Sequence, residues 1–372
     1  MKTLKLITFV LGTRPEAIKL APVINIFKNS MKFNIRVIST GQHKEMVDSV
    51  LELFAIKVNK NLNIMKDGQS LSYITTSSME GLNEEFSEFP PDLVLIQGDT
   101  STALSAALSA FYKSIPIGHI EAGLRTGDIF DPFPEEANRK LISQIASFHF
   151  APTLSAKNNL LKNGISSGIY ITGNTVIDAL LHTAQNSTKE QFQNIDWEED
   201  KVILMTVHRR ENWGEKLKFI AEGVLKILNE NNNVKVLFPM HLNNKIREPF
   251  QKYLGFHPNV ILIEPLPYNK FVSVLKHCSI VLTDSGGLQE EAPSLGKPIF
   301  VLRDTTERQE VIESGAAQLT TTNPEKIFNN VNKVLNNISN YKKMSSSTNP
   351  FGDGLASKRI LDFCIKELNI IS

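Results

Sequence analysis

Short apolar runs rich in β-branched residues recur along the chain, and each is followed by a longer stretch whose apolar positions have helical spacing. Most of these runs are continuously apolar rather than alternating, which is typical of parallel strands covered on both faces. The pattern predicts strands over Leu4–Leu11, Asn34–Ser39, Asp92–Gln97, Pro116–Glu121, Phe148–Ala151, Gly168–Thr172, Lys201–Val207, Val234–Pro239, Asn259–Ile263, Ile280–Thr283, Pro298–Leu302 and Ala317–Leu319. It predicts helices over stretches that include Glu16–Lys28, Ser70–Phe86, Thr102–Tyr112, Glu135–Ala146, Leu217–Asn229 and Leu355–Leu368. Strand–helix alternation in both halves indicates an α/β protein with two Rossmann-like, doubly wound parallel-sheet domains.

The length of the chain also points to two domains. At 372 residues, 41% of them hydrophobic, it is longer than one ordinary domain and apolar enough to fill two cores. The boundary is expected at the turn-rich segment Thr172–Asn174 or in the polar stretch Asn186–Asp200. With the first choice, residues 1–172 form an N-terminal domain and residues 173–354 a C-terminal domain. The last helix, 355–372, is expected to pack back on the N-terminal domain.

Charge and cysteine content argue against several classes of protein. The 40 Lys and Arg residues nearly balance 39 Asp and Glu residues, so no basic field for nucleic acid is expected. No apolar stretch reaches the ~18 residues of a membrane span, and Met1–Leu11 has the pattern of a buried strand rather than a signal peptide. Cys278 and Cys364 lie far apart, which fits a reducing compartment. We therefore expect a soluble, cytoplasmic protein without nucleic-acid or membrane partners.

The first segment with candidate chemistry is Gly12–Lys19, directly after the first predicted strand. Thr13 can cap the next helix, whose free N–H groups attract anions, and Arg14 and Lys19 add positive charge as a phosphate clamp would. The same residues also fit a capped surface helix with solvated basic side chains. The segment is not the G-x-G-x-x-G fingerprint of dinucleotide binding, so no NAD is expected.

Three carboxylates are expected near one edge of the first sheet. Asp99 follows a predicted strand, where an acid either caps the next helix or takes part in catalysis. Glu121 ends the next strand and Glu135 opens a helix, and such a cluster is costly unless function needs it. His119 and Glu121 point to one face of their strand, but no further ligand of suitable spacing accompanies them. No metal site is therefore expected.

The second half adds residues suited to a diphosphate. His208 ends a predicted strand and could face a negatively charged leaving group. Ser285, Gly286 and Gly287 follow another strand and open a helix, so backbone N–H groups there can approach phosphate oxygens, and a carboxylate further on can bind ribose hydroxyls. The segment Thr305–Arg308 supplies a second polar loop of phosphate size.

With these segments the chain resembles the non-hydrolysing UDP-N-acetylglucosamine 2-epimerases over nearly its whole length. The family's pattern appears as G-T-R-P-E-A-I-K (12–19), G-Q-H-K-E-M (41–46), Q-G-D-T (97–100), H-I-E-A-G-L-R-T-G (119–127), P-E-E-A-N-R (134–139), T-G-N-T-V-I-D (172–178), H-R-R-E-N (208–212), D-S-G-G-L-Q-E-E-A-P-S-L-G-K-P (284–298), R-D-T-T-E-R (303–308) and N-P-F-G-D-G (349–354). The order and length of these motifs make a chance resemblance negligible.

The resemblance implies a glycosyltransferase-B type fold with UDP in the cleft between two domains, a homodimer, and interconversion of UDP-GlcNAc and UDP-ManNAc that supplies ManNAc units for cell-surface polysaccharide. It assigns catalysis to Asp99, Glu121, Glu135 and His208. It assigns substrate binding to Arg14, Lys19, Leu266, Phe271, Ser285, Gly286, Gly287, Glu291 and Arg308. Leu266 stands where some relatives carry Gln, which is compatible with a contact to uracil through the backbone.

The chemistry of such a reaction accounts for these residue types. Departure of UDP from C1 gives the sugar oxocarbenium character, loss of the C2 proton then yields a glucal, and UDP adds back after a proton returns to the opposite face. Carboxylates move the protons and cations stabilise the departing UDP, without metal or NAD. Two alternatives remain: a 2-epimerase for a related UDP-sugar of the 3-acetamido uronic acid type, and a transferase of glycosyltransferase-B type. The resemblance also implies an activating second UDP-GlcNAc site at Gln42, His43, Gln69, Glu136, Arg209 and His241.

Overall fold

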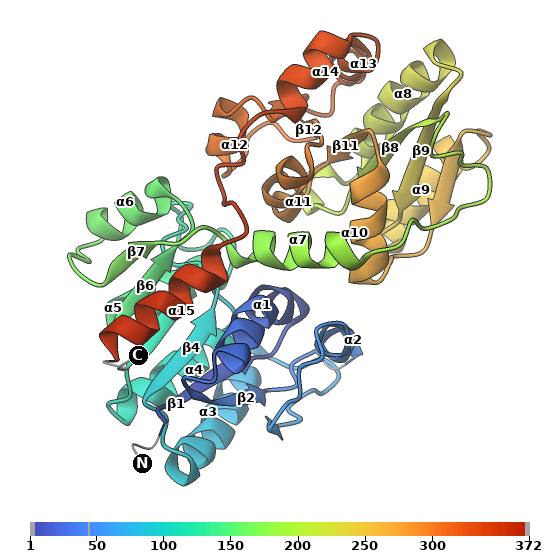
Figure 1. Ribbon diagram of the computed structural model, residues 1–372. Coiled ribbons are helices and arrows are strands. Elements are labelled where there is room, and N and C mark those ends of the chain that lie inside the picture. The colour runs from blue at the N-terminus through green and yellow to red at the C-terminus, as the bar shows by residue number, and fades with distance from the viewer. Residues whose placement is uncertain (1–3, 44, 369–372) are drawn as a thin grey trace. The chain divides into compact units, whose positions relative to one another are not determined.

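The strands of the protein gather into two sheets, each flanked by helices (Figure 1). The computed structural model describes residues 4–43 and 45–368. All strand pairs in both sheets are parallel. None of the helices among these residues is both long and apolar enough to cross a membrane. The two doubly wound parallel sheets predicted from the strand–helix alternation are confirmed.

Contacts between residues divide the chain into two compact units. Unit 1 comprises Met1–Ala179 and Phe351–Ser372, and unit 2 comprises Leu180–Pro350. The chain leaves unit 1 within helix α7 (Thr175–Asn186) and returns after Pro350. The domain bounds at residues 172 and 354 stay a prediction.

In the described part of unit 1, seven strands form the sheet in the order β3-β2-β1-β4-β5-β6-β7. They are β1 (Leu6–Leu11), β2 (Asn34–Ser39), β3 (Lys60–Asn61), β4 (Leu93–Gln97), β5 (Ile117–Ile120), β6 (Phe148–Ala151) and β7 (Ile169–Ile171). From β1 the chain first winds outward through β2 and β3, and then crosses to β4 on the other side of β1. The carboxyl ends of β1 and β4 thus flank a topological switch point, where folds of this kind bind ligands.

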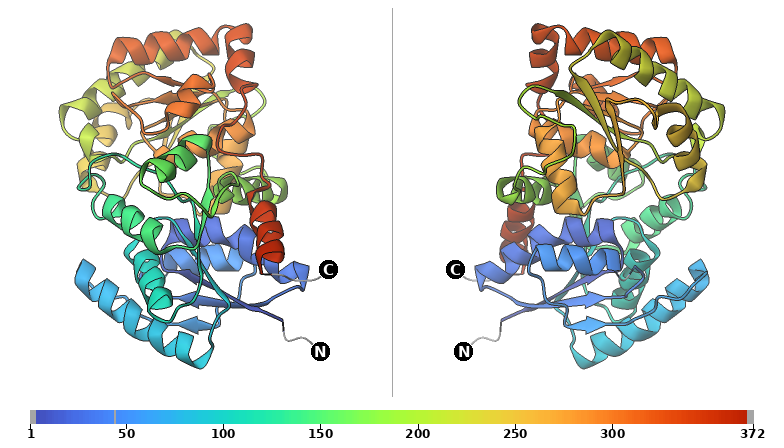
Figure 2. Two further views of the ribbon diagram at one scale, coloured as in Figure 1. Left: turned by 90° about the vertical axis from the view of Figure 1, so that its left-hand side faces the viewer. Right: turned by 90° about the vertical axis from the view of Figure 1, so that its right-hand side faces the viewer.

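Helices cover both faces of this sheet (Figure 2). Neighbouring residues of β1 point to opposite faces: the Phe9 ring lies 5.5 Å from the Phe27 ring, whereas Val10 belongs to a buried cluster on the other face. Phe363 adds the last helix to the Phe9 side, 5.3 Å from the Phe150 ring. The helices of unit 1 are α1 (Arg14–Ser30), α2 (Glu45–Leu53), α3 (Leu71–Glu88), α4 (Ser101–Tyr112), α5 (Glu135–Ile145), α6 (Leu154–Lys162) and α15 (Ala356–Glu367).

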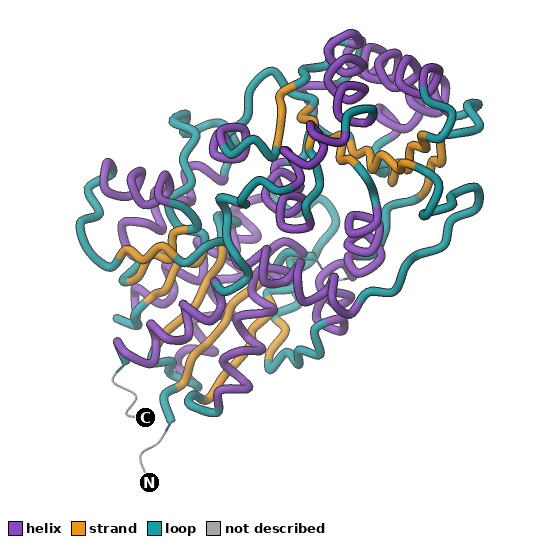
Figure 3. Tube along the Cα trace, turned by 45° about the horizontal axis from the view of Figure 1, so that its top comes forward, coloured by secondary structure: helices purple, strands orange, loops and turns teal. Residues whose placement is uncertain are grey.

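The described part of unit 2 repeats the design with six strands in the order β10-β9-β8-β11-β12-β13. They are β8 (Lys201–Thr206), β9 (Val234–Pro239), β10 (Val260–Ile263), β11 (Ile280–Thr283), β12 (Ile299–Val301) and β13 (Ala317–Leu319). Figure 3 shows strands alternating with helices along the chain. The helices are α8 (Glu215–Glu230), α9 (Asn244–Leu254), α10 (Tyr268–His277), α11 (Gly286–Glu291), α12 (Gln309–Glu313), α13 (Pro324–Leu335) and α14 (Ile338–Ser345). Side chains of α8, α9 and α13 share one buried cluster with the strands. Here the switch point lies between β8 and β11.

Every strand expected from the apolar runs is present, with ends within two residues of the prediction. The short strand β3 was not expected, because two residues leave no hydrophobic pattern to recognise. The last predicted helix is confirmed as α15, which packs beside α1. Residues 369–372, which the expected domain bounds include, lie outside the described residues.

Candidate active site

The loop after β1 carries the first candidate residues, and a buried acid holds it in place. The Glu16 carboxylate accepts the N–H groups of Gly12 at 3.0 Å and Thr13 at 2.7 Å, and the Thr100 hydroxyl at 2.6 Å. Burial raises the pKa of Glu16, an effect that these hydrogen bonds oppose. Since Thr100 follows Asp99, Glu16 connects the loop that begins α1 with the loop after β4, on the two sides of the switch point.

Glu121 lies at the carboxyl end of β5 in a strained backbone conformation. Its φ of 66° is in the left-handed region, which is unfavourable for a residue with a side chain, and it is 8% exposed. Both carboxylate oxygens accept from the Lys19 ammonium, at 2.6 and 2.7 Å. Oε1 also accepts from the Asn174 amide at 2.9 Å, and Oε2 accepts from the Gln97 amide. The structure thus brings together Lys19 and Glu121, which are 102 positions apart in the sequence.

Asp99 is tied to helix α5, which begins with Glu135. Arg139 Nε lies 2.7 Å from Asp99 Oδ2, and the Asn138 amide donates to the Asp99 carbonyl at 2.8 Å. Arg139 also contacts the fully buried Glu136 carboxylate at 3.0 Å. One arginine therefore bridges a predicted catalytic acid and an acid predicted for the second site.

Asp99 and Glu121 are neighbours through Gly98. A Cβ on Gly98 would lie 3.7 Å from Glu121 Oε2, in ordinary van der Waals contact, but the φ of +73° makes any side chain at this position strained. His119 is fully buried, and its Nε2 lies 2.7 Å from the Gly98 carbonyl oxygen, which fixes the turn. Burial lowers the pKa of His119 to about 3, so it is neutral at physiological pH. His119 therefore supports this loop from within the core.

In unit 2, His208 and Asp284 follow the two strands that flank the switch point. His208 Nδ1 lies 3.1 Å from Asp284 Oδ1, and the His208 ring stacks 6.2 Å from the His241 ring, which follows β9. Arg209 donates its backbone N–H to Asp284 Oδ2 at 2.9 Å. A carboxylate, two imidazoles and a guanidinium thus meet at this edge.

The predicted anion-binding residues of unit 2 also come together. Helix α11 begins at Gly286, where a Cβ would stand 3.1 Å from Glu307 Oε1 and 3.3 Å from the Arg308 guanidinium carbon. Arg308 Nη2 lies 2.8 Å from Glu290 Oε1, and its Nη1 lies 2.5 Å from Glu307 Oε1. Burial alone would raise the pKa of Glu307, but Arg308, Arg303 and Arg209 together hold it at about 2. With glycine at this position the side chains of Glu307 and Arg308 come close to the helix start, and a Cβ there would require them to shift by a few tenths of an ångström.

The residues predicted for the nucleoside lie around α10. Leu266 precedes this helix and Phe271 is on its first turn. The hydroxyl of Tyr268, also on that turn, donates to Glu291 Oε1 at 3.3 Å. Leu266, Phe271 and, through Tyr268, Glu291 are therefore placed at the end of α10 where the helix begins.

The residues predicted for a second site fall into both units. In unit 1, the Gln69 amide donates to the Gln42 carbonyl at 3.2 Å, and the Gln42 side chain accepts from Thr102 at 2.9 Å. His43 follows Gln42 and donates its N–H to the Gly12 carbonyl at 2.9 Å. Glu136 is on α5 with Arg139, as described above, and Arg209 and His241 are in unit 2 beside His208.

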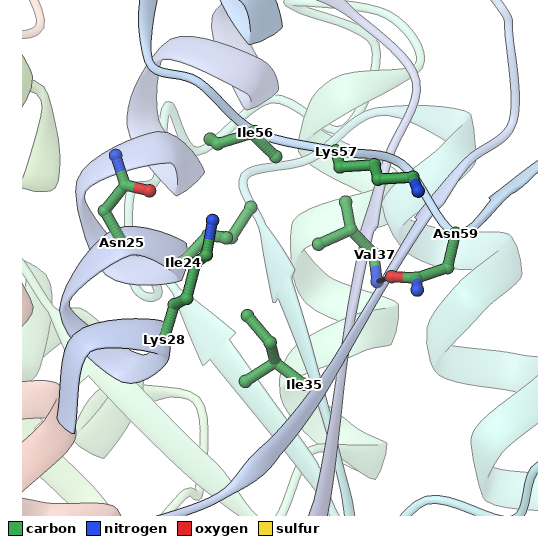
Figure 4. A pocket seen from close by; sticks show the side chains of 8 residues that line it. All are labelled: Ile24, Asn25, Lys28, Ile35, Val37, Ile56, Lys57 and Asn59. Atoms are coloured by element: carbon green, nitrogen blue, oxygen red, sulfur yellow. Dashed lines mark hydrogen bonds between the residues drawn. The ribbon is translucent and has the colours of Figure 1, made fainter. Parts of the chain in front are cut away.

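An apolar hollow elsewhere in unit 1 contains none of the candidate residues (Figure 4). It has a volume of about 230 Å³ and lies between α1, β2 and the chain after α2. Its lining residues are Ile24, Asn25, Lys28, Ile35, Val37, Ile56, Lys57 and Asn59. Since Arg14 and Lys19 are on the first turns of α1, the hollow lies along the other half of that helix.

Four residues of the site were not singled out by the sequence: Gln97, Arg139, Asn174 and Asp284. Each stands inside one of the motifs, so the motifs themselves contained the signal. Gln97 and Asn174 hold Glu121, Arg139 holds Asp99, and Asp284 holds His208. Their roles depend on which carboxylate or imidazole each one meets, and only the fold decides that.

Comparison with known proteins identifies relatives over nearly the full chain. The family model described as UDP-N-acetylglucosamine 2-epimerase matches residues 25–365. The proteins of that name from Escherichia coli O157:H7 and Bacillus subtilis (strain 168) are 46% and 47% identical, covering 95% and 97% of this chain and 96% and 95% of their own length. The crystal structure of UDP-GlcNAc 2-epimerase from Neisseria meningitidis bound to UDP-GlcNAc is similar at a TM-score of 0.89 and 45% identity, covering 97% of this chain and 100% of that one.

Proposed function

The chain belongs to the UDP-N-acetylglucosamine 2-epimerase family, and from this premise we propose that it interconverts UDP-GlcNAc and UDP-ManNAc by inverting C2 of the sugar. The observation that carries the proposal is the pair Asp99 and Glu121, which follow the neighbouring strands β4 and β5 at the carboxyl edge of the first sheet and are each held by a basic side chain. Two carboxylates beside one ligand position suit a reaction in which a proton leaves one face of C2 and returns to the other. As an isomerase of this kind, the enzyme supplies ManNAc units for cell-surface polysaccharide.

The reaction proceeds by loss and re-addition of UDP. The C2 proton becomes acidic only after the C1–O bond to UDP breaks and leaves oxocarbenium character on the ring. One of Asp99, Glu121 and Glu135 then takes the C2 proton, and a second returns a proton to the opposite face. Which acid serves which face is left open. The Glu121 carboxylate contacts the Lys19 ammonium. A positive charge therefore still faces Glu121 after the cationic sugar has lost its proton and become the neutral glucal.

Unit 2 holds the leaving group in this proposal. Arg308, His208 and the backbone N–H groups of Ser285–Gly287 stabilise the diphosphate as negative charge develops on it, together with Arg14 of unit 1. The cluster around α10 and Glu291 takes the uridine, as its apolar, aromatic and carboxylate groups suit a base and a ribose. Exclusion of water from the site lets the glucal recombine with UDP before it escapes.

A second UDP-GlcNAc activates the enzyme in this proposal. Support comes from Arg139, which contacts both Glu136 of the second set and the catalytic Asp99. A ligand that favours the active arrangement shifts the population toward it only through differential affinity. Pure UDP-ManNAc should react slowly until a little UDP-GlcNAc is added. Arg139→Met should abolish that response, whereas Gln144→Met, at an exposed position of the same helix, should keep it. Immediate turnover of UDP-ManNAc without any response to UDP-GlcNAc would contradict the second site.

The expected homodimer and cytoplasmic location belong to the same proposal. Exposed apolar side chains on neighbouring helices, Phe111 and Tyr112 at the end of α4 and Leu141 of α5, offer a surface for a second copy. Light scattering during size-exclusion chromatography should give twice the mass of 41.6 kDa. A monomer at micromolar concentration would contradict the dimer. The cytoplasmic location is supported by the buried, free thiols of Cys278 and Cys364, which suit a reducing compartment.

The reaction is tested by NMR of UDP-GlcNAc incubated with pure protein in D₂O. We expect UDP-ManNAc to appear with deuterium at C2. An epimer that keeps its original hydrogen would contradict elimination and re-addition. Release of UDP only in the presence of an acceptor would indicate a transferase, and turnover only of 3-acetamido uronic acid derivatives would indicate the related epimerase.

Asp99→Asn and Glu135→Gln should each lower kcat by roughly 10²–10⁴-fold, the usual contribution of a general acid or base. Equal weakening of UDP binding would make that acid a binding group instead.

A further inference from the structure

The Asp284 carboxylate is fully buried in unit 2, yet no basic side chain of the lysine or arginine type pairs with it among the described residues. Its Oδ2 accepts the N–H groups of His208 at 3.0 Å and Arg209 at 2.9 Å, and the Asn212 amide at 3.0 Å. Its Oδ1 lies 3.1 Å from Nδ1 of the His208 ring. A buried carboxylate is stable only when its oxygens are satisfied in this way. The carboxylate therefore organises the whole turn that follows β8.

Asp284 remains ionised in this setting. Burial by itself would raise the pKa of its carboxyl, but the donors from His208 and Arg209 lower the pKa below its ordinary value. An ionised carboxylate only accepts hydrogen bonds, so the atom opposite Oδ1 must carry a hydrogen. The His208 ring accordingly has its hydrogen on Nδ1. Since the side chain is 42% exposed, Nε2 is the ring nitrogen available to a ligand.

A second imidazole, that of His241, lies beside the His208 ring but differs from it in its contacts. Its ring lies nearly parallel to that of His208, with 6.2 Å between centroids, but its Nδ1 accepts the backbone N–H of Asn243 at 3.2 Å. Burial, and then the charge on His208, lower the pKa of His241, while Asp284 opposes this effect. Of the two adjacent imidazoles, His208 is thus the one whose ring nitrogen contacts the carboxylate. The other charged group facing it is Arg209, whose guanidinium is engaged with Glu307 at 3.2 Å.

From this geometry we infer that Asp284 is a positioning residue for the leaving-group chemistry: it orients His208 and keeps Nδ1 protonated, so that His208 can present an Nε2–H to the departing diphosphate. The inference rests on the proposed epimerisation for the identity of the leaving group. The carboxylate stabilises the imidazolium, which donates Nε2–H to a phosphate oxygen as the C1–O bond breaks. When UDP adds back, the proton returns to Nε2. No proton moves to Asp284 at any stage.

The tautomer is measured in the unaltered protein by ¹⁵N NMR of histidine-labelled chain, with the His208 signal assigned by its loss in His208→Gln. A hydrogen on Nδ1, in either the neutral ring or the imidazolium, is the expected result. A neutral ring with its hydrogen on Nε2 alone would overturn the inference. This measurement does not depend on turnover, so it stands even if the chain proves not to epimerise UDP-GlcNAc.

A double-mutant cycle then tests whether Asp284 acts through His208. Asp284→Asn should lower kcat on the order of 100-fold with KM changed less than about threefold, as for other groups that orient a catalytic histidine. In the His208→Gln background the same change should cost less than about threefold. An equal loss in both backgrounds would mean that Asp284 only maintains the fold.

Asn212→Ala is the matched control for the order of the turn. It removes one donor to Asp284 and one to the Leu302 carbonyl, but leaves the contact between Asp284 and the His208 ring intact. We expect a lower midpoint of thermal unfolding with kcat within about threefold of the unaltered enzyme. A loss of kcat as large as that of Asp284→Asn would assign the effect to the turn and overturn the inference.

Discussion

Replacing Glu121 by Gln should destabilise unit 1 as well as stop catalysis, because the carboxylate is a structural anchor. Oε1 accepts from Lys19 and Asn174, and Oε2 accepts from Lys19 and Gln97. In glutamine one of these oxygens becomes an NH₂ group, which faces two donors whichever way the amide is turned. The Lys19 ammonium then faces a neutral carbonyl oxygen and an amide nitrogen in place of the carboxylate.

The size of the loss follows from the burial of the pair. The side chains of Lys19 and Glu121 are 17% and 6% exposed, so neither is well solvated. Removing one member of a buried ion pair costs about 3–5 kcal/mol. The remaining exposure of Lys19 and its contact to the carbonyl oxygen of the glutamine place the expected loss for Glu121→Gln near the lower end, about 3 kcal/mol. Adding Lys19→Met removes the positive charge that had faced the carboxylate, so the double variant should regain about 2 kcal/mol although it has lost a further hydrogen-bonding group.

Urea unfolding of the single and double variants measures these differences. Both tryptophans, Trp197 and Trp213, belong to unit 2, so their fluorescence reports that unit while far-UV circular dichroism reports both. If the units unfold separately, the fluorescence midpoint should stay constant and serve as an internal control. Both variants should remain inactive. A single variant as stable as the unaltered chain, or a double variant no more stable than the single one, would refute the reasoning.

Two further predictions concern the core of unit 1. Burial lowers the pKa of His119 to about 3 and that of His149 to about 4, so below pH 6.5 the unfolded chain binds more protons than the folded one and stability falls by about 1.4 kcal/mol per pH unit for each histidine. His119→Gln should lower the measured slope by about 1.4 kcal/mol per pH unit between pH 6 and 4, as determined from urea midpoints, and an unchanged slope would contradict the assignment. A Cβ on Gly123 would lie 2.2 Å from the Ala156 carbonyl oxygen, whereas one on Gly127 would meet nothing within 4 Å, although both residues have positive φ. Gly123→Ala should therefore lower the thermal midpoint far more than Gly127→Ala, whose cost is about 1–2 kcal/mol of backbone strain, and equal effects would contradict the close approach.

For the catalytic acids, motif spacing predicts the position in the sheet but not the side chains that contact them. An acid directly after a buried parallel strand must lie at the carboxyl edge of the sheet, so Asp99 and Glu121 could be assigned to one edge without coordinates. Their basic partners could not be predicted in the same way. Lys19 and Arg139 are long side chains on helices, and whether each meets a carboxylate or solvent depends on how those helices pack. The short strand β3 escaped prediction for a related reason, since its two residues pair through backbone groups alone.

What the sequence by itself determined is local: apolar runs made the strands, and small or acidic residues after them marked the edge where ligands bind. These features follow from periodicity and turn chemistry, which act over a few residues. What only the tertiary structure decided is pairing over long separations. The order of strands placed β1 beside β4 and β8 beside β11, and this brought Glu16 to Thr100 and Asp284 to His208. Such contacts form because a buried polar group is stable only when it is hydrogen-bonded. Its partner is a residue that the packing of the sheet and helices places within about 3 Å.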